Sequence, residues 1–180
     1  MGLSTQTIEQ FLASSERRAF RMAEIATGNR EEALDLVQDA MYKLVRHYAH
    51  KPGEEWGPLF TRIVQSGIRD WYRRNRVRSK WRVWLGKPDE NERESPLEQL
   101  PGPDHEGPEA VHETASAMDK LQGALRQLPL RQQQAFLLRN WEGLDVAETA
   151  RAMGCSTGSV KTHYSRAVHR LREQLEGYWP

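Results

Sequence analysis

The chain has 180 residues, enough for one ordinary domain or two small ones, and its formal net charge at pH 7 is only +1. No stretch approaches the roughly 18 consecutive apolar residues of a membrane span, and a single cysteine excludes an intrachain disulfide framework. The first ten residues have neither a basic lead nor an apolar run, so we expect no export signal, no membrane insertion and a cytoplasmic location.

Charge is unevenly distributed and divides the chain into three segments. Residues 1–86 contain 15 Lys and Arg against 10 Asp and Glu, residues 87–115 contain 2 against 9, and residues 116–180 contain 9 against 6. The acidic middle segment also holds five prolines, and a proline-rich segment of like charge cannot readily bury a core. We therefore predict two small domains, 1–86 and 116–180, joined by an acidic linker over 87–115. One domain with a long surface loop is the less favoured alternative.

The first segment is predicted to be helical because apolar residues recur at spacings of three and four. We expect helices from about Ile8 to Ala26, from an N-cap at Asn29, and from about Leu59 onward. Prolines and glycines between Pro52 and Pro58 predict a break before the third helix. The residues expected to face inward are Phe11, Leu12, Phe20, Ile25, Ala33, Val37, Ala40, Met41, Leu44, Val45, Tyr48, Phe60, Ile63, Val64, Gly67, Ile68 and Trp71.

The last segment predicts four more helices, so the whole fold is expected to be all-α. Two of them run from Met118 to Leu128, before Pro129, and from Arg131 to Trp141. A short helix follows an N-cap at Asp145, with Glu148 in the capping-box position, and the last helix runs from Ser156 to about Leu175. A short capped helix, a tight glycine turn and a longer helix form the pattern of a helix-turn-helix.

The stretch "GCSTGSVKTH", residues 154–163, allows two other interpretations. A phosphate-binding P-loop needs a different glycine spacing, a glycine before the lysine and a preceding strand, and this stretch has none of these. Cys155 as a nucleophile would need an activating base, but His163 lies about two helical turns away. As a helix-turn-helix, the last helix puts Val160, Tyr164, Ala167, Leu171 and Leu175 on one face and Gly158, Lys161, Thr162, Ser165, Arg166 and His169 on the other. The second face is small, polar and basic, as entry into the DNA major groove requires.

A second candidate nucleic-acid site is "IRDWYRRNRVRSKWRVW", residues 68–84. It has seven basic residues between Arg69 and Arg82 against one acidic residue, interleaved with tryptophan and tyrosine. Basic residues attract phosphate, and aromatic rings among them indicate stacking on unpaired bases. The alternative is that Trp71 and Tyr72 are core residues beside a solvated basic helix end, and both interpretations hold in part.

These segments together resemble bacterial RNA polymerase sigma factors of the extracytoplasmic-function (ECF) group of the sigma-70 family, from about Phe11 to Leu175. "DLVQDAM", residues 35–41, is similar to the family motif that docks on the clamp helices of the polymerase's largest subunit. "LFTRIVQSGIRDWYRR" is similar to the helix that holds the −10 promoter element, with Leu59 and Ser66 where tryptophan and asparagine are usual. The C-terminal segment is similar to the −35-binding domain almost throughout.

The resemblance implies a set of binding residues and partners. The loop at about 51–58 would help to melt the −10 element, the acidic linker would thread the channel that nascent RNA otherwise occupies, and an anti-sigma factor is the expected inhibitor. The implied residues are, for core polymerase, Asp35, Leu36, Gln38, Asp39 and Met41; for −10 DNA, Trp56, Arg62, Ser66, Arg69, Tyr72, Arg73, Arg74 and Arg76; and for −35 DNA, Ser156, Thr157, Gly158, Ser159, Lys161, Thr162, Ser165, Arg166 and His169.

The favoured hypothesis is therefore a non-enzymatic sigma factor that binds core RNA polymerase and promoter DNA, with no cofactor. A stand-alone helix-turn-helix regulator is the alternative, and the motif at 35–41 argues against it because a simple repressor needs no polymerase contact. A metal or thiol enzyme ranks last, since His47 and His50 lack further residues that would complete a metal site.

Overall fold

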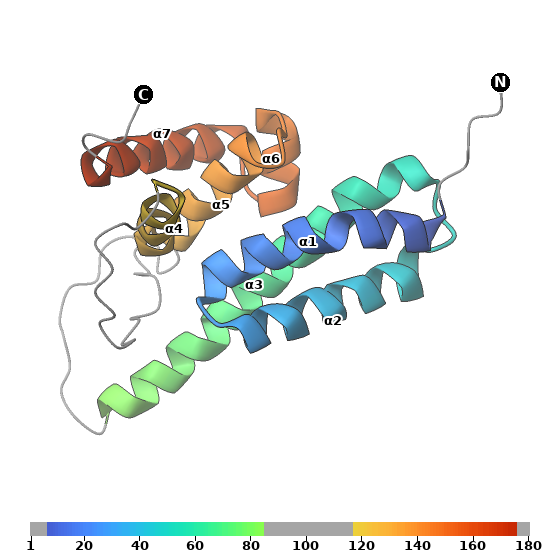
Figure 1. Ribbon diagram of the computed structural model, residues 1–180, viewed down its shortest axis with the longest axis horizontal. Coiled ribbons are helices and arrows are strands. Elements are labelled where there is room, and N and C mark those ends of the chain that lie inside the picture. Colours follow the sequence, from blue (N-terminus) through green and yellow to red (C-terminus); the bar gives the residue numbers. More distant parts are fainter. Residues whose placement is uncertain (1–6, 85–116, 176–180) are drawn as a thin grey trace.

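Seven α-helices make up residues 7–84 and 117–175, the part of the chain that the computed structural model describes (Figure 1). Helices α1 (Ile8–Thr27), α2 (Arg30–Tyr48) and α3 (Gly53–Trp84) form an N-terminal unit. Helices α4 (Ala117–Gln127), α5 (Leu130–Asn140), α6 (Val146–Met153) and α7 (Thr157–Gln174) form a C-terminal unit. The all-α prediction is confirmed for these residues, and the predicted linker lies outside them.

Local capping signals start α2 and α6 where the sequence indicates. The Asn29 side chain accepts hydrogen bonds from the backbone N–H groups of Glu31 and Glu32, at 2.9 and 3.1 Å. At α6 the predicted capping box is present, with Asp145 and Glu148 each accepting from the other's backbone N–H. Such caps satisfy donors that the first helical turn leaves unpaired, and each stabilises a helix by about 1 kcal/mol.

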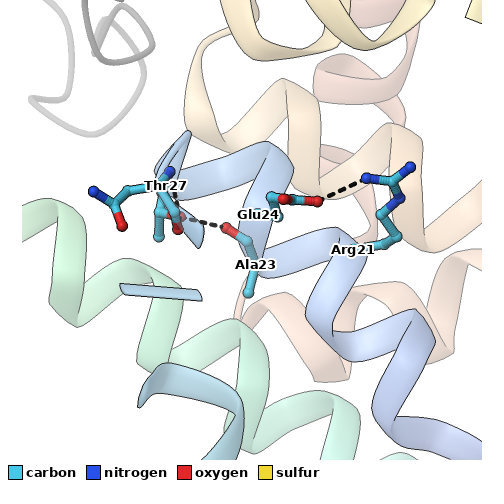
Figure 2. A network of polar contacts seen from close by, with 5 residues as sticks. Arg21, Ala23, Glu24 and Thr27 are labelled. Carbon is cyan, nitrogen blue, oxygen red and sulfur yellow. Dashed lines mark hydrogen bonds and ion pairs between the residues drawn. The ribbon is translucent and has the colours of Figure 1, made fainter. Parts of the chain in front are cut away.

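A short turn joins α1 to α2 and makes the two helices antiparallel (Figure 1). Gly28 ends α1 in the left-handed conformation, with φ of 65°. Beside it, the Thr27 hydroxyl donates to the carbonyl of Ala23 at 2.9 Å, and Arg21 pairs with Glu24 at 2.7 Å one turn earlier (Figure 2). The hydroxyl also accepts from the backbone N–H of Asn29 at 3.2 Å, so Thr27 ties the end of α1 to the cap of α2.

Helix α3 is continuous from Gly53, and the predicted break between Pro52 and Pro58 is wrong. Trp56 explains the difference: it is buried, its Nε1 donates to the carbonyl of Tyr48 at 3.1 Å, and its ring centroid lies 6.0 Å from that of Phe11. Pro58 removes only one backbone donor near the start of a 32-residue helix. Tertiary packing of the indole therefore outweighs the low helix propensity of the segment.

Each unit has its own apolar cluster, and each cluster also includes residues from the other unit. Most of the expected inward residues of the N-terminal unit are buried or half-buried, but Val45 is 43% exposed, so that prediction is wrong. Leu130 of α5 packs in the N-terminal cluster, while Met22 and Ile25 of α1 pack in the C-terminal one. The two units therefore pack against each other, with α3 lying along α6.

Candidate nucleic-acid and polymerase interfaces

Helices α6 and α7 form the predicted helix-turn-helix. Gly154 follows α6 with φ of 64° and ψ of 44°, a left-handed conformation that favours glycine, and its N–H donates to carbonyls of the last turn of α6. Ser156 then caps α7, since its hydroxyl accepts from the backbone N–H of Ser159 at 3.1 Å. Three residues, 154–156, thus connect the two helices.

The outer face of α7 presents the polar and basic residues that the sequence analysis assigned to it. Eight of the nine residues predicted to bind −35 DNA are exposed: Ser156, Thr157, Gly158, Lys161, Thr162, Ser165, Arg166 and His169. Ser159 is half-buried, and its hydroxyl lies 2.9 Å from that of Ser156. The opposite face is apolar and buried at Val160, Ala167, Leu171 and Leu175, which anchors the helix and leaves its outer face open.

His163 lies outside the helical-face prediction, whereas the half-buried Tyr164 lies on the predicted inner face. His163 is 5% exposed and belongs to the inner side of α7. Tyr164 stacks on Phe136 of α5 with ring centroids 6.2 Å apart and an interplanar angle of 15°. Helical periodicity follows apolar residues, so it does not predict the burial of a polar imidazole, and the buried His163 has an interaction partner in the structure.

The arginines of α3 whose side chains the structure describes fall into two groups. Arg62, Arg73 and Arg74 are exposed, and Arg73 also pairs with Asp70. Arg69 is half-buried, and its Nη1 donates to the backbone carbonyl of Met153 in α6 at 2.7 Å. Burial lowers the pKa of Arg69, and the nearby Arg131 adds to this effect. Arg69 is therefore engaged by the helix-turn-helix, whereas the other three guanidinium groups are open to solvent.

Trp56 and Tyr72, both predicted to contact −10 DNA, lie in the core of the N-terminal unit. The Tyr72 hydroxyl donates to the carbonyl of Ala26 at 2.9 Å, and its ring packs edge-on against Trp71. Burial raises the pKa of the Tyr72 hydroxyl. In this conformation both aromatic residues support α3 from within. Ser66 is half-buried, and the side chain of Arg76 lies outside the described part of α3.

The predicted polymerase-binding motif occupies the solvent side of α2. Asp35, Gln38 and Asp39 are exposed, and Asp39 pairs with Lys43 at 2.7 Å. The other two motif residues, Leu36 and Met41, are half-buried and pack against the N-terminal cluster. The motif thus offers carboxylate and amide groups to a partner while its apolar members attach α2 to the unit.

An exposed apolar stripe beside this motif was missed by the sequence analysis. Leu34, Tyr42 and Val45 are 38%, 59% and 43% exposed. At about 100° per residue they share one face of α2 with Gln38. Large apolar groups that remain exposed next to polar ones are typical of a protein-binding surface. The signal was present in the sequence, because the apolar residues of α2 cover more than one face.

The surroundings of Cys155 reduce its reactivity as a nucleophile. Burial raises the pKa of the Cys155 thiol, and Arg131 and Arg69 only partly oppose this, so the thiolate is disfavoured. Among the side chains that the structure describes, in residues 7–75 and 119–175, no three His, Cys, Asp or Glu are grouped so as to hold a metal ion. Of the described helices, none has the length and apolarity to cross a membrane. An exposed recognition helix and a basic long helix instead define a helical DNA-binding protein.

Comparison with known proteins places the chain within that class. Residues 8–78 match sigma-70 region 2, and residues 118–171 match sigma-70, region 4. The RNA polymerase sigma-E factor of Streptomyces avermitilis is 32% identical over 170 residues, which cover 93% of this chain and 84% of that protein. The sigma-E factor of Streptomyces antibioticus is 35% identical over 147 residues, covering 81% and 71%.

A solved structure shares the fold. The sigma factor RpoE from Bartonella quintana, crystallised with the anti-sigma factor NepR, superposes with a TM-score of 0.63 at 23% identity, covering 93% of this chain and 96% of that one. With the two region matches and the sigma-E relatives, the assignment is clear. The chain belongs to the ECF group of the sigma-70 family: it is a non-enzymatic RNA polymerase sigma factor that binds core polymerase and promoter DNA and directs transcription initiation.

Proposed function

We propose that the three surfaces divide the work of promoter recognition: α2 binds core polymerase, α3 holds the −10 element and α7 reads the −35 element. The observation that carries this proposal is the exposure of eight of the nine residues predicted to contact −35 DNA, on a helix whose other face is anchored in the core. A recognition helix must meet both conditions to enter a major groove.

On α7, residues at the N-terminal end contact the DNA backbone and position the helix, and residues in the middle of the helix contact the bases. Ser156 and Thr157 lie where backbone N–H groups and the helix dipole favour a phosphate. Lys161 and Arg166 are exposed donors that reach guanine or phosphate, and Ser165 and Gly158 permit close approach to the duplex.

On α3, Arg62, Ser66, Arg69, Arg73, Arg74 and Arg76 form the proposed −10 surface. Trp56 and Tyr72 serve this surface from the core, and either ring would have to leave its internal hydrogen bond to stack on a base. Ser66, which stands where the family has asparagine, gives the −10 contact a shorter side chain. We therefore expect the details of −10 recognition to differ from those of asparagine-containing relatives.

On α2, the carboxylates and amide of the 35–41 motif and the adjacent stripe of Leu34, Tyr42 and Val45 form one polymerase-binding surface. We propose the same division of the chain as above: an N-terminal domain over 1–86, a linker over 87–115 and a C-terminal domain over 116–180. The acidic, proline-rich segment between the domains suits the polymerase channel for nascent RNA, since it can mimic the charge of RNA. An anti-sigma factor such as the one bound by the Bartonella quintana relative is the expected regulator, and the cytoplasm is the expected location.

A reconstituted transcription assay tests the proposal. It combines the purified chain, bacterial core polymerase and a pool of genomic promoter fragments. Transcripts that start downstream of shared −10 and −35 elements only when the chain is present are the expected result. Specific binding to duplex DNA without any transcription would refute it and favour a stand-alone regulator.

A further inference from the structure

Tyr164 joins α7 to the end of α5 through three directional contacts. Its ring stacks on that of Phe136, with the centroids 6.2 Å apart and an interplanar angle of 15°. Its hydroxyl donates to Oδ1 of Asn140 at 3.3 Å. The guanidinium carbon of Arg139 lies over the same ring, 5.9 Å from its centroid, which is within the range of a cation–π interaction. Tyr164 therefore contacts three side chains in the last two turns of α5.

The same end of α5 also holds the start of α6. Nη1 of Arg139 donates to the backbone carbonyl of Leu144, the residue that precedes the N-cap Asp145 of α6. The backbone N–H of Leu144 donates to the carbonyl of Leu138 at 3.0 Å. Arg139 is therefore in contact with Tyr164 on α7 and with the segment that begins α6, so one guanidinium relates the two helices of the helix-turn-helix.

The apolar contacts of α7 constrain its orientation less strictly. Val160, Ala167 and Leu171 are buried on its inner face. Apolar burial is non-directional, so it holds a helix against its neighbours more firmly than it specifies a rotation about the helix axis. A stacked ring, a cation over that ring and a hydroxyl hydrogen bond each have a preferred geometry. The contacts of Tyr164 therefore restrict the rotation of α7.

The residues proposed to read the −35 element lie beside Tyr164 in the sequence. Lys161, Ser165 and Arg166 are all exposed on the outer face of the helix. Side-chain ends lie about 5–6 Å from a helix axis, so a rotation of about 15° moves them by about 1.5 Å. Binding residues must be held to within about 0.5 Å and 10–20° of their productive geometry. A small rotation of α7 is therefore enough to misplace its base contacts.

We propose that Tyr164 is a positioning residue for −35 recognition: held by Phe136, Arg139 and Asn140, it sets the rotation of α7 and its placement relative to the start of α6. The first helix of a helix-turn-helix crosses the DNA backbone while the second enters the major groove. Their relative placement therefore decides which bases the second helix meets. The role in recognition rests on the proposed function of α7, whereas the fixed orientation of α7 does not.

Two substitutions of Tyr164 in the full chain separate the contributions of its ring and its hydroxyl. Tyr164→Leu keeps an apolar side chain on the inner face but removes the stack, the cation–π contact and the hydrogen bond. Tyr164→Phe restores the ring and lacks only the hydrogen bond to Asn140. Leu125→Ala is the control for loss of stability, because Leu125 is buried in α4 within the same apolar cluster.

Binding is measured below the unfolding temperature of every variant. The probes are a duplex with the −35 element of a promoter that the transcription assay identifies, the same duplex with single base-pair substitutions, and a random duplex. Tyr164→Leu should bind the −35 duplex about tenfold more weakly, because base contacts carry the discrimination. It should bind the random duplex equally well, because phosphate contacts are independent of sequence. The penalties for single substitutions should shrink.

The other two variants distinguish positioning from support of the fold. Tyr164→Phe should bind the −35 duplex within about twofold of the natural chain, since the stacked ring is kept. Leu125→Ala should lower Tm but keep the preference for the −35 duplex. An equal loss on both duplexes in Tyr164→Leu, or the same loss of preference in Leu125→Ala, would overturn the proposal. Tyr164→Phe as impaired as Tyr164→Leu would overturn the role of the ring.

The orientation of α7 is tested without DNA. Residual dipolar couplings of the backbone N–H groups, measured by NMR on the free chain, give the angle between α5 and α7. We expect the same angle in the natural chain and in Tyr164→Phe, and a changed one in Tyr164→Leu. Unchanged couplings in Tyr164→Leu would overturn positioning. If the couplings change but the natural chain does not prefer the −35 duplex, the proposed function of α7 fails while its orientation by Tyr164 stands.

Discussion

Replacement of Gly154 by alanine tests whether backbone handedness at the turn holds the helix-turn-helix together. Gly154 has φ of 64°, and a left-handed conformation costs an L-residue about 1–2 kcal/mol. A Cβ at this position would come no closer than 4.0 Å to Nη2 of Arg69, which is ordinary contact, so no clash is added. We expect Gly154→Ala to lower the free energy of unfolding by about 1–2 kcal/mol.

Two other glycines provide matched controls for that substitution. Gly143 has φ of 67° and open space around its Cβ position, so Gly143→Ala should be destabilising by a similar amount. Gly123 lies inside α4 with nothing within 4 Å, and alanine there should stabilise the chain by about 0.5–1 kcal/mol. The three substitutions add the same methyl group, so their signs isolate the backbone effect.

Thermal unfolding followed by circular dichroism is the assay. For a chain of this size about 1 kcal/mol moves Tm by about 2–4 °C, so Gly154→Ala should lower Tm by about 2–8 °C and Gly123→Ala should raise it. Urea unfolding would give the free energies directly. Equal stability of Gly154→Ala and the natural chain would refute the reasoning, as would a loss of stability in Gly123→Ala.

Three further predictions concern the surfaces. Asp35→Ala with Gln38→Ala should weaken binding to core polymerase, measured by pull-down or fluorescence titration. The helical content should not change, because both side chains are exposed. Unaltered binding would argue against the α2 surface. Arg166→Ala should cost about 1–3 kcal/mol on the specific −35 duplex, measured against random DNA, and an equal loss on both would reassign Arg166 to phosphate contact. Cys155 should react with iodoacetamide more slowly at pH 8 than a free cysteine, because burial raises its pKa and depletes the thiolate; an equal rate would contradict this.

Local chemistry explains which parts of the fold could be predicted from the sequence. Asn29, Asp145 with Glu148, and Gly154 act on backbone groups within three or four residues, so their roles can be read without knowing the fold. The outer face of α7 follows from helical period alone. The capping box of Thr7 and Gln10 was not predicted, because the apolar pattern of α1 is weak and does not mark clearly where the helix begins.

The features that the sequence did not predict correctly depend on contacts between residues that are far apart in the sequence. Trp56 makes a helix of a proline- and glycine-containing segment by packing on Phe11, 45 residues earlier. Gln65 and Gln134 are both polar, and only their mutual contact across 69 residues explains why neither is exposed. Exposure of Val45 likewise depends on which sides of α2 receive α1 and α3.

The chemistry of the contact between the units determines what can open it. Glutamine amides carry no charge at any physiological pH, the Met153 carbonyl does not titrate, and a guanidinium remains protonated even when burial lowers its pKa. Acidification or alkaline stress therefore finds no group in these hydrogen bonds to protonate or deprotonate. These hydrogen bonds are insensitive to pH, whereas the thioether sulfur of Met22, which accepts from Nε2 of Gln65 at 3.7 Å, is an oxidisable group beside them.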